Sequence, residues 1–490
     1  MTMAERRNGL PQEVRKTLEA NPGFADLSHL ACIECETTYP SSEVIYKCTS
    51  TTFEKQNGND SRGICGDILD VRYEFRETDP EFLKELWLAR RMSNAPQDRS
   101  GVWRFRETIP FIDDPNSVVT LFEGNTPLFD APVSAKYIGL PRLRLKHQGF
   151  NPTGSFKDPG MTAAVSIANS LSMEAVACAS TGNTSASMAA YAKRAGFLPI
   201  VFIPEGQIAI GKLSQALDYG ALTMQIKGDF DEAMGMVMRI APKLGIYVVN
   251  SINPYRIEGQ KTMVYELMEQ LSWEVPDRIV VPGGNLGHAS SIGKALHEMV
   301  ELGFIDKMPR ITVIQAEGAD PLYETITSDD PNQLITVHAK TLATAVKIGN
   351  PISWKKAKNY VNETDGWVEK VSEQEIADAK AIVGREGIGC EPASALTVAG
   401  IKKLVEFGTD SPIDKDEDVV VILTGNVLKD PDYTVNYHMD RLYEDYVTSL
   451  NVLEKAGKIG STFANAPIQV EADEAAIARI IEERLANARK

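Results

Sequence analysis

Short apolar segments alternate with longer amphipathic segments over residues 140–330, and this alternation constrains the fold more than any other feature. A strand that is apolar along its whole length must be covered on both faces, and the helical segments between successive strands supply that cover. We therefore predict an α/β fold built on mostly parallel sheets. Ligands of such folds bind in the loops beyond the carboxyl ends of the strands. The predicted strands are 143–146, 175–179, 199–203, 222–226, 246–250, 278–281, 311–315 and, in a looser region that follows, 419–423.

The chain of 490 residues is too long for one ordinary core, so we expect several domains. Helices are predicted near 12–19 and over 474–487. A further helix is predicted to begin at Asp79 and Pro80, because these residues suit an N-cap and a first helical turn. The expected divisions are an N-terminal extension with a cysteine-containing β module (1–78), a connector (79–140), a main body (141–445) whose smaller α/β subdomain surrounds 150–250, and a C-terminal docking segment with its helix (446–490).

The charge of the chain limits the kinds of partner that it can bind. A formal net charge of −16 argues against nucleic acid or an anionic membrane surface as the main partner. No run of about 18 apolar residues is present, so we expect no membrane-spanning helix. Residues 1–16 contain arginines without an apolar stretch behind them, which argues against a secretory signal. We expect a cytoplasmic protein that acts on a small molecule.

Four of the six cysteines lie close together in the sequence, at Cys32, Cys35, Cys48 and Cys65. The first pair has the C-x-x-C spacing of tetrahedral zinc sites. Sixteen residues separate the second pair, however, where a standard zinc ribbon has only a few. The expectation is therefore a small β module without metal, and zinc bound by the four cysteines is the alternative.

A zinc ribbon that binds nucleic acid, attached to an inactive core, is a further alternative. Such a module needs a basic surface over residues 30–76. The stretch is instead acidic overall, with Glu34, Glu36, Glu43, Asp60, Asp67 and Asp70. An enzyme is therefore the favoured class.

Lys157 lies in a turn-rich loop, 151–158, between a predicted strand and a helix expected over 161–171. Pro152 and Gly154 favour a turn, and Ser155 is the predicted helix cap. A lysine at such a junction can lose solvation, which lowers the pKa of its amine and lets it form a Schiff base.

Three further loops follow predicted strands. Residues 180–185 combine small hydroxyl residues with Gly182 and Asn183 at a helix start, which attracts anions and offers an amide to a ring oxygen. Residues 282–288 hold three glycines before a helix and predict a cradle for a single phosphate, without the spacing of a dinucleotide loop or a P-loop. Thr424 ends the last strand, where a hydroxyl can hydrogen-bond a pyridine nitrogen. Together with the lysine, these loops describe a pyridoxal-phosphate site.

From residue 121 to about 470 the chain resembles the threonine synthases, pyridoxal-phosphate enzymes of fold type II. The resemblance is carried by the motifs NPTGSFKD (151–158), CASTGNTS (178–185), NSINPYRIEGQK (250–261), PGGNLGH (282–288), CEPASA (390–395) and LTGNVLKD (423–430). The pair NPTGSFKD and CEPASA separates this family from most relatives. The cysteine segment also resembles a small module that many members carry. The resemblance implies two three-layer αβα domains with mostly parallel sheets, and it is compatible with a homodimer.

The resemblance also implies roles for individual residues. Lys157 would form the imine with the cofactor and move protons during the reaction. Asn183 would face the cofactor's 3-hydroxyl and Thr424 its ring nitrogen, while its phosphate would be bound by Gly284, Asn285, Leu286, Gly287 and His288. The phosphate of the substrate would be bound by Thr184, Ser251, Arg256 and Asn285, since a guanidinium fork suits a phosphate.

Two positions depart from loops that are common in the family. GNLGN becomes GNLGH at His288, which a cradle of backbone amides tolerates. TGHGLKD becomes TGNVLKD at Asn426, which argues against an imidazole acting as acid or base there.

The implied reaction converts O-phospho-L-homoserine and water into L-threonine and phosphate. One alternative is a β-replacement enzyme similar to cysteate synthase, which uses phosphoserine and sulfite. The two substrates differ by one carbon, and a methylene provides only about 1–3 kcal/mol of discrimination. A threonine or serine dehydratase is the other alternative, and Ser251 with Arg256 argues against it because the pair indicates a substrate that carries a phosphate.

Overall fold

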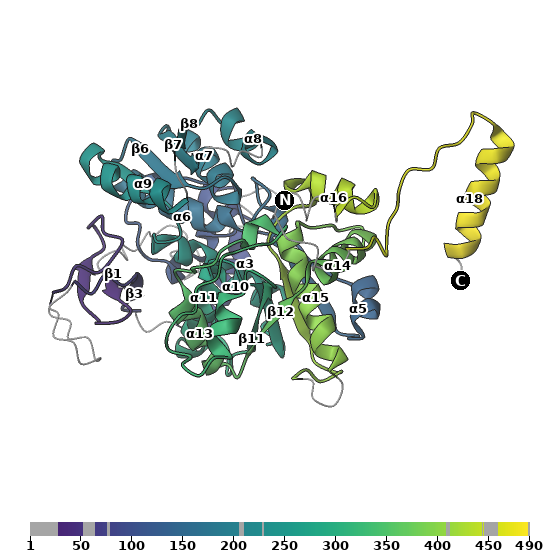
Figure 1. Cartoon of the computed structure of the whole chain (residues 1–490). Coiled ribbons are helices and arrows are strands. Elements are labelled where there is room, and N and C mark those ends of the chain that lie inside the picture. Colours follow the sequence, from purple (N-terminus) through teal and green to yellow (C-terminus); the bar gives the residue numbers. More distant parts are fainter. Residues whose placement is uncertain are drawn as a thin grey trace. The chain divides into compact units, whose positions relative to one another are not determined.

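The computed structural model describes residues 28–51, 64–75, 79–204, 210–227, 230–407, 412–442, 444 and 459–488. The helix predicted near 12–19 lies outside these residues. Two compact units divide the chain, residues 1–431 and 432–490. The described residues of the larger unit form three sheets, and Figure 1 labels several of their strands and helices.

A six-stranded sheet forms the centre of the larger unit. Its strands follow the order β12 (Trp367–Val371), β11 (Arg310–Ala316), β10 (Arg278–Pro282), β13 (Val419–Leu423), β5 (Leu143–His147) and β4 (Leu128–Asp130). Neighbouring strands are parallel except for β4, which pairs antiparallel with β5. Because side chains alternate along a strand, Val420 and Ile422 of β13 face one apolar cluster and Val421 and Leu423 face another.

Helices cover both faces of this sheet. One cluster includes residues of α3 (Pro80–Arg90), α10 (Tyr255–Gln270), α11 (Gly287–Glu301) and α13 (Trp354–Glu363). The opposite cluster includes residues of α5 (Pro132–Ile138), α14 (Glu373–Arg385) and α15 (Pro392–Glu406). The short helices α4 (Pro96–Arg99) and α12 (Pro321–Ile326) lie in connecting segments.

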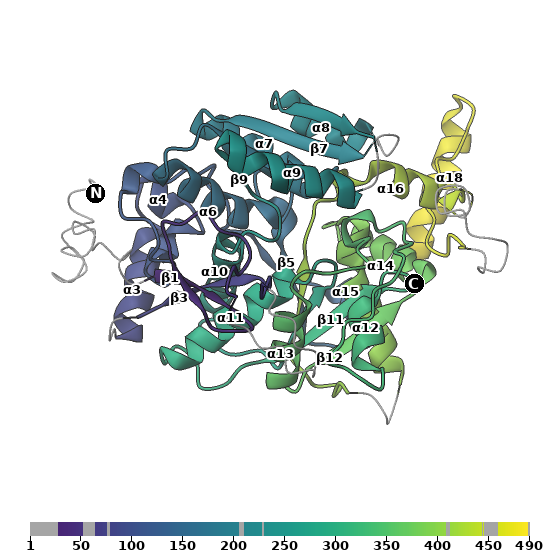
Figure 2. The same ribbon diagram turned by 60° about the vertical axis from the view of Figure 1, so that its left-hand side comes forward.

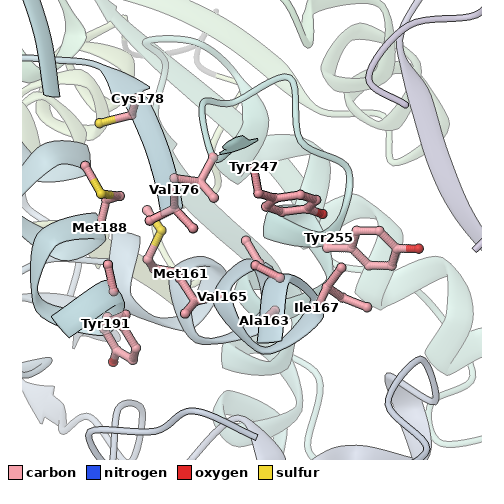
Figure 3. Packing of buried hydrophobic residues seen from close by; sticks show 14 of the residues in the cluster. Met161, Ala163, Val165, Ile167, Val176, Cys178, Met188, Tyr191, Tyr247 and Tyr255 are labelled. Atoms are coloured by element: carbon pink, nitrogen blue, oxygen red, sulfur yellow. The ribbon is translucent and has the colours of Figure 1, made fainter. Parts of the chain in front are cut away.

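A smaller sheet of four parallel strands has the order β8 (Leu222–Ile226), β7 (Leu198–Pro204), β6 (Ala175–Ala179) and β9 (Ile246–Val248). One face packs on α6 (Lys157–Ser170), α7 (Asn183–Ala195) and α8 (Ile210–Asp218), and the other on α9 (Phe230–Leu244). Figure 3 shows the first face, where Met161 of α6 lies beside Val176 of β6. The fold type is confirmed: each of these two sheets is the middle layer of an αβα arrangement.

The cysteine module (residues 28–51 and 64–75) contains the third sheet, drawn in purple in Figures 1 and 2. Its strands β2 (Thr38–Pro40), β1 (Ser28–Cys32) and β3 (Leu69–Tyr73) pair antiparallel, with Leu30 opposite both Tyr39 and Val71. In the second unit, α16 (Pro431–His438) and α18 (Glu474–Ala488) are the described helices. None of the helices formed by the described residues is long and apolar enough to cross a membrane.

The structure contains every strand that the sequence predicts, and β10, for example, differs from its predicted range by one residue. The cap before α3 is also confirmed, because the Asp79 side chain accepts a hydrogen bond of 2.9 Å from the Glu81 N–H. The predicted cap of α6 is wrong: the helix begins at Lys157 with Phe156 as its N-cap. The domain boundaries and the docking role of 446–490 stay predictions.

Candidate functional site

A cavity of about 60 Å³ lies where the loops that follow several parallel strands meet. Loops after β5, β9, β10 and β13 all contribute to it. It brings together most of the predicted site residues: Lys157, Ser251, Arg256, Gly284, Asn285, Leu286, Gly287, His288 and Thr424. Asn183 and Thr184, at the start of α7, are not among its lining residues.

The amine of Lys157 occupies an environment that favours its neutral form. The side chain is partly exposed toward the cavity, and its Nζ lies 3.9 Å from the centroid of the Phe156 ring. Desolvation by the surrounding protein, assisted by the positive charge of Arg256 and opposed by Glu391, lowers the pKa of Lys157 to about 7. A large share of the amine is therefore unprotonated near neutral pH, as a nucleophile for an aldehyde requires.

Hydrogen bonds hold the loop before Lys157 in place. The buried carboxylate of Asp158 accepts bonds from the N–H (2.7 Å) and hydroxyl (2.6 Å) of Thr153 and from the Ser187 hydroxyl (2.5 Å). The N–H of Phe156 donates to the carbonyl of Thr424 at 2.8 Å. Together with a bond of 2.9 Å from the Asn426 N–H to the carbonyl of Gly154, this bond ties the lysine loop directly to the segment at the end of β13.

The glycine turn 283–287 forms a concave surface at the N-terminus of α11. Leu286 adopts a left-handed conformation (φ 64°) as the N-cap residue, which turns the chain into the helix. A Cβ atom on Gly284 would lie 3.1 Å from the Cα of Val346, so a side chain there would press on the neighbouring backbone. Backbone amides at a helix N-terminus, reached over glycine, suit a phosphate.

His288 closes this turn without contributing a charge. Its ring packs edge-on against Phe156 at a centroid distance of 4.5 Å. Burial and the nearby charge of Lys157 lower the pKa of His288 to about 3, so the imidazole is neutral. Neither ring nitrogen has a hydrogen-bond partner among the described residues. A neutral, buried imidazole with unpaired nitrogens is costly unless a bound group satisfies it.

Thr424 belongs to a hydroxyl–carboxylate group that the sequence did not predict. Its hydroxyl donates to Glu391 at 3.0 Å and lies 2.9 Å from the hydroxyl of Ser394. The amide of Asn183 donates to the other oxygen of Glu391 at 2.9 Å, and burial raises the pKa of Glu391. Asn183 thus reaches the cavity through Glu391. Glu391 and Ser394 belong to the motif CEPASA (390–395), whose sequence alone predicts no chemical role.

Arg256 supplies a cation to the cavity, and part of its guanidinium is not engaged in hydrogen bonds within the described residues. It is 3% exposed, and its Nη1 donates to the carbonyl of Val249 at 3.3 Å. Its Nε has no hydrogen-bond partner within the described part of the chain. Burial lowers its pKa to about 10, which leaves the group charged at neutral pH. Ser251 lies close by, and its hydroxyl accepts a hydrogen bond from the Asn285 amide.

The four cysteines that the sequence analysis gave as the alternative zinc ligands also come together, in the cysteine module. The Sγ atoms of Cys32, Cys35, Cys48 and Cys65 all lie within 4.8 Å of one another. The sixteen-residue insertion therefore does not separate the second pair, contrary to what the spacing in the sequence suggested.

The residues around the cavity fit pyridoxal phosphate. They offer an amine of lowered pKa for its aldehyde, a glycine turn at a helix N-terminus for its phosphate and a hydroxyl at the end of β13 for its ring nitrogen. The unpaired nitrogens of His288 and Arg256 indicate that the cavity is built to receive polar groups.

Comparisons with known proteins agree with this chemistry. Residues 119–425 match the family described as pyridoxal-phosphate dependent enzyme. Threonine synthase of Methanocaldococcus jannaschii is 44% identical over 82% of this chain and 93% of its own length, and that of Methanosarcina acetivorans is 43% identical over 83% and 94%. The solved structure of threonine synthase from Escherichia coli matches 93% of this chain and all of its own, with a TM-score of 0.60 at 15% identity, which supports the fold.

Proposed function

Since the chain belongs to the threonine synthases, a family of pyridoxal-phosphate-dependent lyases, we propose that it converts O-phospho-L-homoserine and water into L-threonine and phosphate. The observation that carries this proposal is one cavity that contains both the Lys157 amine of lowered pKa and the Arg256 guanidinium with an unpaired Nε. The first suits an aldehyde cofactor, and the second suits a substrate that carries a phosphate.

The bound cofactor supplies an electron-withdrawing ring that makes the substrate protons at Cα and Cβ acidic. Lys157 would hold the cofactor. Once displaced by the substrate amine, its Nζ would take the proton from Cα and, after giving that proton up, take one from Cβ. Phosphate would leave from Cγ with one proton of the attacking water, the hydroxyl of that water would add at Cβ, and Lys157 would return one proton to Cγ and one to Cα. A neutral amine is needed at the first of these steps, and its pKa of about 7 provides one near neutral pH.

Two sets of residues, which share Asn285, would hold the two phosphates. The glycine turn 283–287 binds that of the cofactor through backbone amides, because the neutral His288 offers no charge. Arg256, Ser251 and Asn285 would bind that of the substrate. Thr184, in the first turn of α7, is the fourth residue proposed for this phosphate, although it does not line the cavity in the structure. Thr424, whose hydroxyl is held by Glu391 and Ser394 in the structure, would meet the ring nitrogen of the cofactor.

A homodimer and a cytoplasmic location are also proposed. Light scattering of the purified protein tests the first, and cell fractionation tests the second.

The test of the activity uses the purified protein with pyridoxal phosphate and O-phospho-L-homoserine. Phosphate release and threonine formation, measured together, should proceed at equal rates. Phosphoserine with sulfite, and threonine or serine alone, are supplied in parallel. Cysteate formed faster than threonine, or a 2-oxo acid as the main product, would contradict the proposal and indicate the β-replacement or dehydratase reaction instead.

A further inference from the structure

The sulfurs of the cysteine module have the spacing of metal ligands. Cys32 Sγ lies 3.6 Å from Cys65 Sγ, and Cys35 Sγ lies 3.4 Å from Cys48 Sγ. A disulfide would bring two sulfurs to about 2.05 Å. The edge of a tetrahedron with Zn–S bonds of about 2.3 Å is about 3.8 Å long. All four sulfurs lie within 4.8 Å of one another, close to this second arrangement.

The first pair of ligands comes from one tight turn. Cys32 ends β1, and its N–H donates to the carbonyl of Thr37 at 2.9 Å. Glu36, directly after Cys35, adopts a left-handed conformation with φ of 55°, so the chain folds back on itself. The Glu34 N–H points at the sulfur of Cys32 at 3.4 Å. Such N–H···S contacts stabilise a thiolate that binds metal.

The second pair comes from two chain segments that the backbone pairs side by side. The Cys48 N–H donates to the carbonyl of Asp67 (2.8 Å), the Cys65 N–H to that of Ser50 (2.9 Å) and the Gly66 N–H to that of Cys48 (3.1 Å). Gly66 follows Cys65 with φ of 71°, as Glu36 follows Cys35. The Ser50 N–H lies 3.4 Å from the sulfur of Cys48, as the Glu34 N–H lies from that of Cys32. The long insertion thus separates Cys48 from Cys65 in the sequence, but these two cysteines have the same kind of backbone contacts as Cys32 and Cys35.

From this geometry we infer that Cys32, Cys35, Cys48 and Cys65 bind one Zn²⁺ ion as thiolates. Four sulfur ligands in a tetrahedral arrangement select zinc or iron. A closed set of four protein ligands leaves no position for a reacting molecule, so the ion has a structural role. Binding releases the thiol protons of the ligands and involves no change of oxidation state.

The zinc-bound module holds the segments that carry the substrate-phosphate residues. The Tyr255 hydroxyl donates to the carbonyl of Ser41 (2.7 Å), and the Val248 N–H donates to the Tyr46 hydroxyl (2.7 Å). Tyr255 immediately precedes Arg256 in α10. Lys355 of α13 pairs with Glu34 (2.6 Å), which lies between the ligands Cys32 and Cys35, and with Asp67 (2.5 Å), which follows Cys65 and Gly66. Loss of the metal should therefore loosen the surroundings of Arg256.

The direct test is the metal content of the full-length protein, measured by inductively coupled plasma mass spectrometry after exhaustive dialysis. We expect one zinc ion per chain in the wild type and in Cys178→Ala, which removes a buried cysteine of the β6 strand. Cys35→Ser and Cys65→Ser should each lose nearly all of the zinc. Equal zinc in all four proteins, iron in place of zinc, or a dialysed wild type without metal would overturn the assignment. The zinc content does not depend on catalysis, so this measurement tests the zinc site independently of the proposed reaction.

A second measurement uses only the wild-type chain and covers the case in which the cysteine variants do not fold. Titration with a mercurial reagent that modifies thiols should release one zinc ion per chain, followed with a zinc-sensitive dye. The released protein should melt at a lower temperature, and its KM for O-phosphohomoserine should rise more than its kcat falls. Cysteines 32, 35, 48 and 65 found as disulfides in the untreated protein would contradict the inference.

Discussion

Lys157 is the residue whose protonation should control how the protein takes up its cofactor. Desolvation and, to a smaller extent, Arg256 lower its pKa to about 7, Glu391 opposes them, and His288 beside it is neutral. Only the unprotonated amine can attack an aldehyde, so the rate at which the cofactor-free enzyme binds pyridoxal phosphate covalently should rise about tenfold per pH unit below 7 and level off above it. Stopped-flow absorbance between pH 5.5 and 9 measures this. A lysine with an ordinary pKa of about 10.4 would give a rate that still climbs at pH 9.

Substitution of the same lysine tests the assignment of the amine itself. Lys157→Ala and Lys157→Arg should both lose the visible absorbance of covalently bound cofactor. Phosphate release should slow at least about 100-fold, the smallest loss typical for a general acid–base group. The arginine variant keeps a cation in the cavity but cannot form the imine with the cofactor. It therefore distinguishes the effect of the positive charge from the effect of the covalent bond. Normal colour and turnover in either variant would exclude Lys157.

Arg256 should matter for substrate affinity more than for the chemical step. Arg256→Lys keeps a positive charge but removes the planar fork, and charged hydrogen bonds contribute about 1.5–3 kcal/mol each. The KM for O-phosphohomoserine should therefore rise about 10–100-fold, with a smaller change in kcat. Arg239→Lys, an exposed arginine of α9, is the matched control and should leave KM unchanged. A kcat loss as large as the KM increase would instead place Arg256 at the reacting atoms.

The residues that could be predicted from the sequence are those with a recognisable local pattern. Lys157, the glycine turn and Thr424 each follow a strand within a short motif, and the structure places them around one cavity. Glu391 could not be assigned in this way. Its partners Asn183 and Thr424 lie 208 and 33 positions away in the chain, so its role exists only after folding.

Among the structural elements, the turn from β10 into α11 depends on the absence of a side chain at Gly284. In Gly284→Ala the new methyl group would lie 3.1 Å from the Cα of Val346 and would displace the cradle. Overpacking of this kind costs about 1–3 kcal/mol, so pyridoxal phosphate should bind about tenfold more weakly, as measured by fluorescence titration.

Gly384→Ala is the matched control for this substitution. Gly384 lies on the exposed side of α14, and no atom of the described residues lies within 4 Å of a Cβ added there. The variant should keep the cofactor affinity of the wild type and gain about 0.5–1 kcal/mol of stability, because alanine favours a helix over glycine. Equal cofactor affinity in both alanine variants would rule out a phosphate cradle at Gly284.

The elements that the sequence did not predict are those that lack a continuous apolar run. β12 at the sheet edge reads Trp-Val-Glu-Lys-Val, and its first residue, Trp367, is exposed. β4 has three residues and pairs only with β5. Both are edge strands, which pair with a neighbouring strand on one side only. Fewer of their side chains are buried, so their sequences show a weaker apolar pattern. The start of α6 was missed because a phenylalanine, without a capping side chain, precedes it.

At the scale of the whole molecule, a network of buried charges joins the cysteine module to the main body. Asp70 of β3 accepts from Lys294 of α11 (3.2 Å) and Lys356 of α13 (2.7 Å), and Lys294 also pairs with Glu258 of α10 (2.6 Å). The two lysines lower the pKa of the Asp70 carboxyl against the opposing effect of burial. The carboxylate therefore stabilises the fold above its unfolded pKa of about 3.9, and this contribution is lost as the pH falls through the folded value.

Asp70→Asn tests whether the buried network contributes more to stability than an exposed ion pair does. The amide keeps the shape of the side chain but leaves two buried ammonium groups undercompensated, and breaking a buried pair in this way costs about 3–5 kcal/mol. The urea midpoint should fall markedly, equally at pH 5 and pH 7, since Asp70 is ionised at both. Glu406→Gln breaks an exposed pair with Lys402 on α15 and should cost at most about 1 kcal/mol. If both variants unfold at the same urea concentration, the buried charges contribute no net free energy of unfolding. The cysteine module would then be attached to the main body by its apolar contacts and its zinc-bound core.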